Sequence, residues 1–185
     1  MSDALTAAIR DRGRVDGDLV LVDTFLNPRV DPGLLRDVAG WLSYRRGAAD
    51  AVVTSEASGI APALMVAELR GIPMVFAKKR AEPRDGTLSR QVISPTKGDR
   101  PWLEFAPHVL DGIRSAVVID DFLAGGRTAR ALGEMLTESG IAVVGFGFAI
   151  ERAWAGGRDR LEEAGFTVVA AATVRAVEDG RPVLG

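Results

Sequence analysis

Residues 116–132 contain the side chains of this chain that are best suited to chemistry. The apolar residues 116–119 predict a short buried strand, because the run is too short and too β-branched for a helix. Asp120 and Asp121 follow at the carboxyl end of that strand. In open α/β sheets the ligand lies beyond the carboxyl ends of the strands. The two carboxylates therefore predict a ligand site at this point of the fold.

A turn with paired glycines, Gly125 and Gly126, leads from the acids to Arg127 and Thr128 at the start of a helical pattern. The free N–H groups and the positive dipole end of a helix start suit a phosphate group. The acids would repel a phosphate, so we assign them to ribose hydroxyls or to a bound divalent cation. Alternatively they only cap the helix, since Asp favours N-caps and Asx-turns. The order of strand, acids, glycines and hydroxyl argues against that alternative.

Two other segments could contribute to an anion site. Ser58 and Gly59 stand where a second helix is predicted to begin, so their N–H groups could receive an anion, although capping explains them equally well. Lys78, Lys79 and Arg80 end another predicted strand and could neutralise a diphosphate or form a solvated basic turn. Because side chains alternate along an extended segment, we expect at most one of the two lysines to face a ligand.

The composition of the chain excludes several other kinds of site. At 185 residues it fits a single domain, 1–185, and its net charge of −2 gives no general attraction to nucleic acid. The absence of cysteine excludes disulfides and thiolate nucleophiles, and one histidine cannot form a zinc cluster by itself. The amino end lacks a signal-peptide pattern, and no apolar run approaches the roughly 18 residues of a membrane span. We therefore expect a cytoplasmic protein.

Short apolar strands and amphipathic helices alternate along the chain. Helices are predicted over residues 3–12, 31–44, 59–69, 128–139 and 157–164. Strands are predicted over residues 51–54, 74–77, 116–119, 142–150 and 167–172, with a small edge element in 173–185. Such strand–helix units imply an α/β fold with a mainly parallel twisted sheet and helices on both faces. Residues 80–107 break this rhythm and predict a long functional loop.

The stretch around the acids resembles the phosphoribosyl diphosphate signature of the type I phosphoribosyltransferases. That signature consists of an apolar strand, two acids, two apolar residues and then Ala-(Thr/Asn)-Gly-(Gly/Gln)-Thr or a close variant. Among these enzymes the chain is most similar to the bacterial xanthine phosphoribosyltransferases, over nearly its full length. The matching stretches are 22–27, 56–63, 75–79, 119–124 and 150–152, of which Phe-Leu-Asn at 25–27 is the most discriminating.

This resemblance implies a set of site residues. The phosphoribosyl diphosphate would be held by the loop Ala124, Gly125, Gly126, Arg127 and Thr128. The purine base would be contacted at Val20, Asn27 and Arg152, and Phe25 or Trp154 could stack on it, although such aromatics more commonly pack in a core. The chain departs from the family in having Val20 for a leucine, Arg152 for a lysine and Gly125-Gly126-Arg127 for Asn-Gly-Gln. Arginine keeps the charge but replaces a point donor with a planar fork, which could shift the preferred 6-oxopurine.

The resemblance also implies a reaction and its partners. Phosphoribosyl would pass from the diphosphate donor to xanthine, with Mg²⁺ on the diphosphate and Asp120 and Asp121 on the ribose hydroxyls. We expect a hood from residues 14–30 and 151–185, a lid from 80–107 that offers Arg84, Arg90 or Lys97, and a homodimer. Guanine or hypoxanthine as the base, or a regulator that only senses the donor, are the alternatives.

Overall fold

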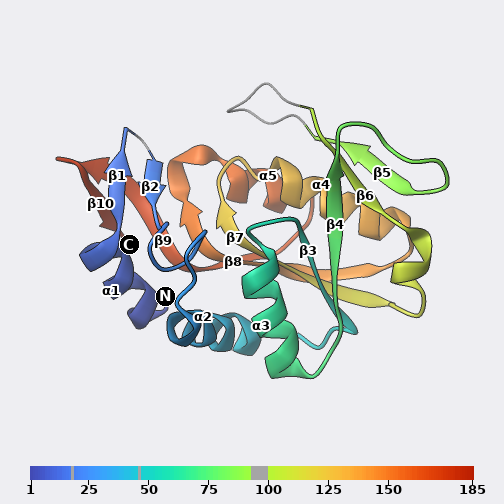
Figure 1. Ribbon diagram of the computed structural model, residues 1–185, viewed down its shortest axis with the longest axis horizontal. Coiled ribbons are helices and arrows are strands. Elements are labelled where there is room, and N and C mark those ends of the chain that lie inside the picture. The colour runs from blue at the N-terminus through green and yellow to red at the C-terminus, as the bar shows by residue number, and fades with distance from the viewer. Residues whose placement is uncertain (18, 46, 93–99) are drawn as a thin grey trace.

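The computed structural model describes residues 1–17, 19–45, 47–92 and 100–185. Its centre is an eight-stranded sheet, and the inner strands β9, β8, β7, β3 and β4 are parallel, whereas β10, β6 and β5 are attached by antiparallel pairing (Figure 1). In spatial order the strands are β10 (Arg181–Leu184), β9 (Val168–Glu178), β8 (Ala142–Arg152), β7 (Ser115–Leu123), β3 (Ala51–Ser55), β4 (Met74–Arg80), β6 (Trp102–Phe105) and β5 (Leu88–Gln91).

Helices cover both faces of the sheet, as expected for the predicted fold class (Figure 1). One face carries α1 (Asp3–Arg12), α2 (Pro32–Tyr44) and α3 (Ile60–Arg70), and the other carries α4 (Arg127–Glu138) and α5 (Gly157–Glu163). Two short 3₁₀ helices, Pro107–Leu110 and Ala153–Ala155, and a separate hairpin of β1 (Arg14–Asp16) and β2 (Leu19–Leu21) complete the elements. The predicted α/β fold is confirmed.

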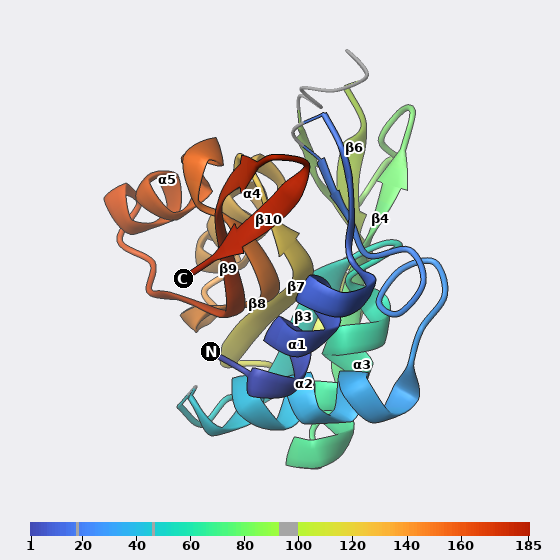
Figure 2. The same ribbon diagram turned by 90° about the vertical axis from the view of Figure 1, so that its left-hand side faces the viewer.

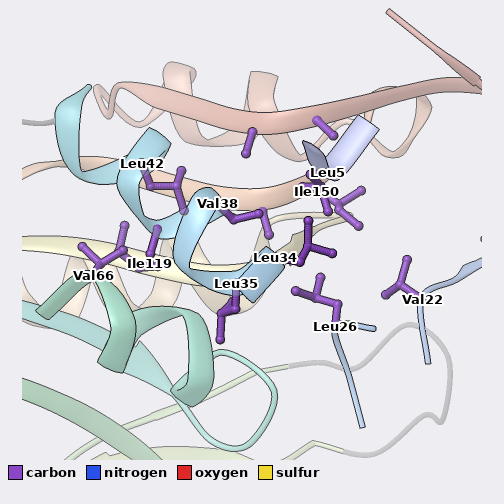
Figure 3. Close-up of a cluster of buried hydrophobic side chains, with 14 of the residues drawn as sticks. Leu5, Val22, Leu26, Leu34, Leu35, Val38, Leu42, Val66, Ile119 and Ile150 are labelled. Carbon is purple, nitrogen blue, oxygen red and sulfur yellow. The ribbon is translucent and has the colours of Figure 1, made fainter. Parts of the chain in front are cut away.

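The sheet separates two apolar cores. Along β7, Val117 and Ile119 belong to the core beneath α1, α2 and α3, whereas Ala116 and Val118 belong to the core beneath α4. This is the alternation that a strand buried on both faces requires. Figure 3 shows the first core, in which side chains of α2 meet those of α3 and of the sheet. The strand that carries the acids is therefore fixed from both sides.

The predicted helices form close to their expected bounds. At α2, the Asp31 carboxylate accepts a hydrogen bond of 3.2 Å from Leu34 N, and Pro32 takes the first helical position, so the predicted cap is confirmed. Strands β8 and β9 run further than predicted, to Arg152 and Glu178. The edge element predicted for 173–185 is the hairpin of β9 and β10.

The prediction of one long loop over residues 80–107 is wrong, because β5 and β6 lie within it and β4 extends to Arg80. The acidic residue that made β6 look like a loop in the sequence has partners elsewhere in the segment. Glu104 is only 2% exposed, and Arg84 donates to it from its backbone N at 2.9 Å and from Nε at 2.7 Å. Burial raises the pKa of Glu104, but the hydrogen bonds and charge of Arg84 together outweigh it, so that the pKa is lowered. Lys97 lies outside the described residues.

The two ends of the chain lie at the same end of the molecule. Figure 2 shows the hairpin of β1 and β2 on the side where β9 and β10 form the sheet edge, and β1 contacts β10. Ser2 N donates to Ala171 O at 2.6 Å, which joins the start of the chain to β9. Within the described ranges, no helix has the length and apolar character needed to cross a lipid bilayer.

Candidate active site

Three parallel strands bring the predicted site residues together at the carboxyl ends of the strands. Ser55 at the end of β3 lies beside Ala77 of β4, and Val53 lies beside Val118 of β7. The segments that follow these strand ends are therefore neighbours. We refer to residues 56–59, between β3 and α3, as the first junction and to residues 124–126, between β7 and α4, as the second junction.

The acidic pair, Asp120 and Asp121, is in direct contact with the first junction. Ser58 Oγ donates a hydrogen bond of 3.0 Å to Asp121 Oδ1, which also accepts from Phe122 N at 2.9 Å. Asp120 Oδ1 accepts from Asp121 N at 3.0 Å. Asp121 is 7% exposed. Ser58, which the sequence suggested as an anion contact, thus also orients one of the acids.

The close approach at Gly59 explains why this position has no side chain. A Cβ there would lie 2.2 Å from both Asp120 Oδ1 and Thr54 Oγ1. Thr54 is fully buried, and its hydroxyl has no hydrogen-bond partner among the described residues. The two oxygens therefore occupy the space beside Gly59 and add a buried hydroxyl to the acids of the site. Sequence analysis missed Thr54, which stands in an apolar strand without any motif around it.

Burial is the largest electrostatic influence on Asp120. Burial raises the pKa of Asp120 well above its ordinary value of 3.8, and the charge of Asp121 raises it further. The ammonium group of Lys79 acts in the opposite direction. Lys79 N also donates to the Glu56 carboxylate, which joins β4 to the first junction. Lys79 is thus a lysine whose charge lowers the pKa of Asp120.

The second junction is shaped by its backbone. Gly126 has a φ of 69° and is the N-cap of α4, so it provides no side chain to occupy the first N–H groups of that helix. A Cβ at Gly126 would lie 2.9 Å from Gly157 O of α5. The guanidinium of Arg160, also on α5, donates to Gly125 O. Helix α5 therefore supports the loop, a role for Gly157 and Arg160 that sequence analysis missed.

A cavity of about 190 Å³ opens next to the second junction. Its lining residues come from β2, β7, the second junction and β8, and are Leu19, Val20, Leu21, Phe122, Ala124 and Arg152. The structure therefore brings together Val20 and Arg152, two of the predicted base contacts, with Ala124 of the predicted donor loop. Phe122 was missed, although it directly follows the acidic pair in the sequence.

The three other predicted base contacts, Phe25, Asn27 and Trp154, have different outcomes. Phe25 is 0% exposed in the core, and the Arg12 guanidinium lies 4.8 Å from its ring centroid, so the prediction that Phe25 stacks on a base is wrong. Asn27 is exposed and does not line the cavity, and its base contact stays a prediction. Trp154 is 43% exposed on the 3₁₀ helix that follows β8.

An ion pair fixes the end of β8, where Arg152 stands. Glu151 is 3% exposed, and its two carboxylate oxygens accept from Arg158 Nε at 2.8 Å and Nη2 at 2.5 Å. The charge-assisted bonds raise the pKa of Arg158 above its ordinary value. Since Arg158 belongs to α5, the same short helix contacts both the second junction and the strand that presents Arg152.

The oxygen ligands at the site suit Mg²⁺ if the substrate contributes to its coordination. Asp120, Asp121 and Thr54 offer two carboxylates and a hydroxyl. Among the described residues no group of three or more His, Cys, Asp or Glu could hold a metal ion alone. Mg²⁺ commonly binds through one or two carboxylates together with substrate phosphates. The residues present fit that mode.

The arginines predicted as lid contributors are both engaged with other side chains. Arg84 contacts Glu104 through Nη2 at 2.5 Å. Arg90 of β5 pairs with Glu134 and, at 2.6 Å, with Glu138, both on α4. In this conformation they hold the strands of the 80–107 segment in place.

Comparison with known proteins gives one consistent result. No protein-family model matches the chain. The xanthine phosphoribosyltransferase of Pseudomonas fluorescens strain Pf0-1 is 36% identical over 183 residues, which cover 96% of each chain. That of Streptococcus agalactiae serotype III strain NEM316 is 38% identical over 176 residues, covering 92% of this chain and 91% of the relative.

Solved structures show the same fold at lower identity. The adenine phosphoribosyltransferase of Rhodothermus marinus DSM 4252 superimposes with a TM-score of 0.76 at 23% identity, covering 94% of this chain and all of the other. The enzyme of Giardia lamblia complexed with 9-deazaadenine has a TM-score of 0.75 at 16% identity, with 95% and 99% coverage. By its full-length similarity to the curated relatives, the chain belongs to the xanthine phosphoribosyltransferase family.

Proposed function

We propose that this protein transfers the phosphoribosyl group of 5-phosphoribosyl 1-diphosphate to xanthine and releases diphosphate. The observation that carries the proposal is the arrangement of the acidic pair between two glycine junctions and beside a cavity that contains Arg152. In the reaction the bond from C1 of the ribose to the diphosphate oxygen breaks, and a bond from C1 to a purine nitrogen forms.

The second junction holds the 5′-phosphate of the donor. Residues 124–128 present the free N–H groups at the start of α4, and the positive end of the helix dipole faces the same space. Arg160 and Gly157 fix this loop from behind, so that the phosphate acts as a fixed pivot and orients the ribose.

The acidic pair stabilises the ribose while the diphosphate departs. Asp120 and Asp121 accept hydrogen bonds from the ribose hydroxyls, and their negative field favours positive charge on the sugar. Lys79, together with Ser58 and Gly59 of the first junction, receives the diphosphate. Bound Mg²⁺ would supply charge neutralisation on the diphosphate oxygens.

The base lies in the cavity lined by Val20, Phe122 and Arg152. The guanidinium of Arg152 donates to a 6-oxo group and disfavours adenine, whose exocyclic amine would face a donor. We further propose that residues 14–30 and 151–185 form a hood over the base, that 80–107 closes as a lid, and that the protein works as a cytoplasmic homodimer.

The test is spectrophotometric turnover of xanthine, guanine, hypoxanthine and adenine with the donor and Mg²⁺. We expect xanthine to be the best substrate and Asp121→Asn to abolish turnover. The matched control is Asp37→Asn on the exposed face of α2, which we expect to leave turnover unchanged. Preference for guanine or hypoxanthine would keep the reaction and place the change of specificity at Arg152. Tight donor binding without turnover of any base would instead identify a sensor.

A further inference from the structure

A second cavity, of about 300 Å³, lies on the flank of α4 and has an arginine-rich lining. We call it the arginine cavity after Arg90 at the end of β5, Arg127 and Arg130 on α4, and Arg160 on α5. Four arginines thus line the cavity together with a single acidic residue, Glu134, in a chain whose net charge is −2. Such a concentration of one charge around a surface cavity attracts anions.

The arginines differ in how far they are already neutralised. Glu134 accepts from Arg130 Nε at 2.7 Å and also pairs with Arg90. The hydrogen bond from Arg130 lowers the pKa of Glu134 despite its partial burial, so this carboxylate is charged at neutral pH. Arg127 makes no ion pair with any residue in the described part of the chain, and Arg160 donates only to the carbonyl of Gly125. The lining therefore retains an excess of positive charge.

The arginine cavity shares no lining residue with the base cavity, and Arg127 is the one lining residue that it has in common with the proposed donor loop 124–128. Its lining positions on α4 include 127, 130, 131 and 134, which follow one side of the helix from its first residue onward. Val92 and Ala131, both buried, give it an apolar floor. The acidic pair contributes nothing to this lining, so an anion can enter without meeting Asp120 or Asp121.

We propose that the arginine cavity is a second anion site, which binds a diphosphate group beside the donor site. Planar guanidinium groups bind phosphate oxygens in pairs, and four arginines line this cavity. Diphosphate competes with Glu134 for Arg90 and Arg130. Because Arg90 connects β5 to α4 through Glu134 and Glu138, occupation of the site changes how this strand is held. The diphosphate group can be free diphosphate or part of a nucleoside diphosphate.

The test is calorimetric titration of diphosphate into protein saturated with phosphoribosyl diphosphate and excess Mg²⁺, without a base. A prior titration of the donor alone establishes that the donor site is filled. We expect diphosphate to bind the saturated protein at one site. Arg130→Gln should weaken that binding about tenfold, the worth of one hydrogen bond between charged groups, whereas Glu134→Gln should tighten it by removing the competing charge. Arg114→Gln, at the residue before β7 whose side chain is 89% exposed, is the matched control.

Failure of diphosphate to bind the saturated protein would overturn the proposal, as would equal affinities in the Arg130 and Glu134 variants. A titration with ADP in the same protein separates the two sources, since a nucleotide site binds ADP more tightly than free diphosphate. If the donor itself does not bind, the proposed function fails, and titration of the ligand-free variants with diphosphate still tests the arginine cavity.

Discussion

The two junctions of the site resemble each other in sequence but are held in different ways. Each follows a parallel strand, and each ends in a glycine that caps a helix. At the first junction, Gly59 has an ordinary φ of −70°, and its missing Cβ leaves room for the side chains of Asp120 and Thr54. At the second junction, Gly126 has a φ of 69° and packs against the backbone of Gly157.

This difference suggests that the two junctions contribute to different properties, the first to catalysis and the second to stability. The first junction contacts the acidic pair through side chains, which can rotate when a neighbour changes. At the second junction, the backbone of Gly126 packs against the backbone of Gly157, so Gly126 can move only if α5 moves with it. We therefore expect changes at the second junction to act mainly on stability and changes at the first to act mainly on catalysis.

Gly126→Ala should give the largest loss of stability. A left-handed backbone costs roughly 1–2 kcal/mol for a residue with a Cβ, and overpacking against Gly157 adds about 1–3 kcal/mol. Urea denaturation should therefore show a free energy of unfolding lower by about 2–5 kcal/mol, and donor binding should weaken with it. The control is Gly140→Ala, where φ is 75° but nothing lies within 4 Å of the new Cβ. Equal losses in the two variants would show that packing against α5 is unimportant.

Gly59→Ala should lower the free energy of unfolding less than Gly126→Ala does, but it should lower activity strongly. Thr54 and Asp120 must move by side-chain rotation, at about 1–3 kcal/mol for overpacking. Displacement of the carboxylate should lower kcat/KM by about 100-fold, as small misplacements of catalytic groups do. Gly40→Ala within α2, where nothing lies within 4 Å, should be neutral or slightly stabilising. Full activity of the Gly59→Ala variant would show that catalysis does not depend on the position of the Asp120 carboxylate.

Arg160→Gln tests the support that α5 gives to the second junction. Loss of its hydrogen bond to Gly125 O should cost about 1 kcal/mol of stability and raise the KM for the donor several-fold, with little change in kcat. Arg160→Lys should restore part of the effect, and Arg10→Gln on the exposed face of α1 should show none. A fall in kcat at unchanged KM would contradict a positioning role.

The same contrast explains which parts of the site could be predicted from sequence. The second junction was predictable because strand, acids, glycines and helix start are consecutive, and each has a local physical signature. Its support was not, because Arg160 is 35 residues away from Gly125 in the chain, and nothing around Arg160 indicates that partner. Thr54 was hidden for a related reason: a lone hydroxyl in a buried strand carries no motif.

The fold shows the same limit at the sheet edge formed by β6 and β5. Periodicity predicted the parallel strands because their apolar runs reflect burial on both faces. It failed for β6, where the buried Glu104 has its charge compensated by Arg80 of β4 and by Arg84 in the turn after β4. A charged residue whose partner lies 20 positions away resembles a solvated loop until the pairing is seen. The prediction for Phe25 failed in the opposite direction. Its ring was expected to stack on the base, but it packs in the core.

Asp120→Asn should change stability by about as much as Arg160→Gln does, but in the opposite direction. Burial and the charge of Asp121 raise the pKa of Asp120 above 3.8, so the native protein retains a proton that the unfolded chain has lost. Ionisation of Asp120 therefore destabilises the ligand-free fold. This cost is absent below about pH 4, grows as pH rises through the interval between the unfolded and folded pKa values, and is complete above it.

Asparagine keeps the oxygen that accepts from Asp121 N and removes the charge. Thermal unfolding should therefore show a Tm higher by about 2–4 °C at pH 8, the shift that roughly 1 kcal/mol gives in a chain of this length, and no increase at pH 3.5. Turnover should be lost at every pH, because the neutral amide cannot stabilise positive charge on the ribose. Asp37→Asn on α2 should show neither effect. A lower Tm at pH 8 would mean that Lys79 and the backbone stabilise the charged form more than burial disfavours it.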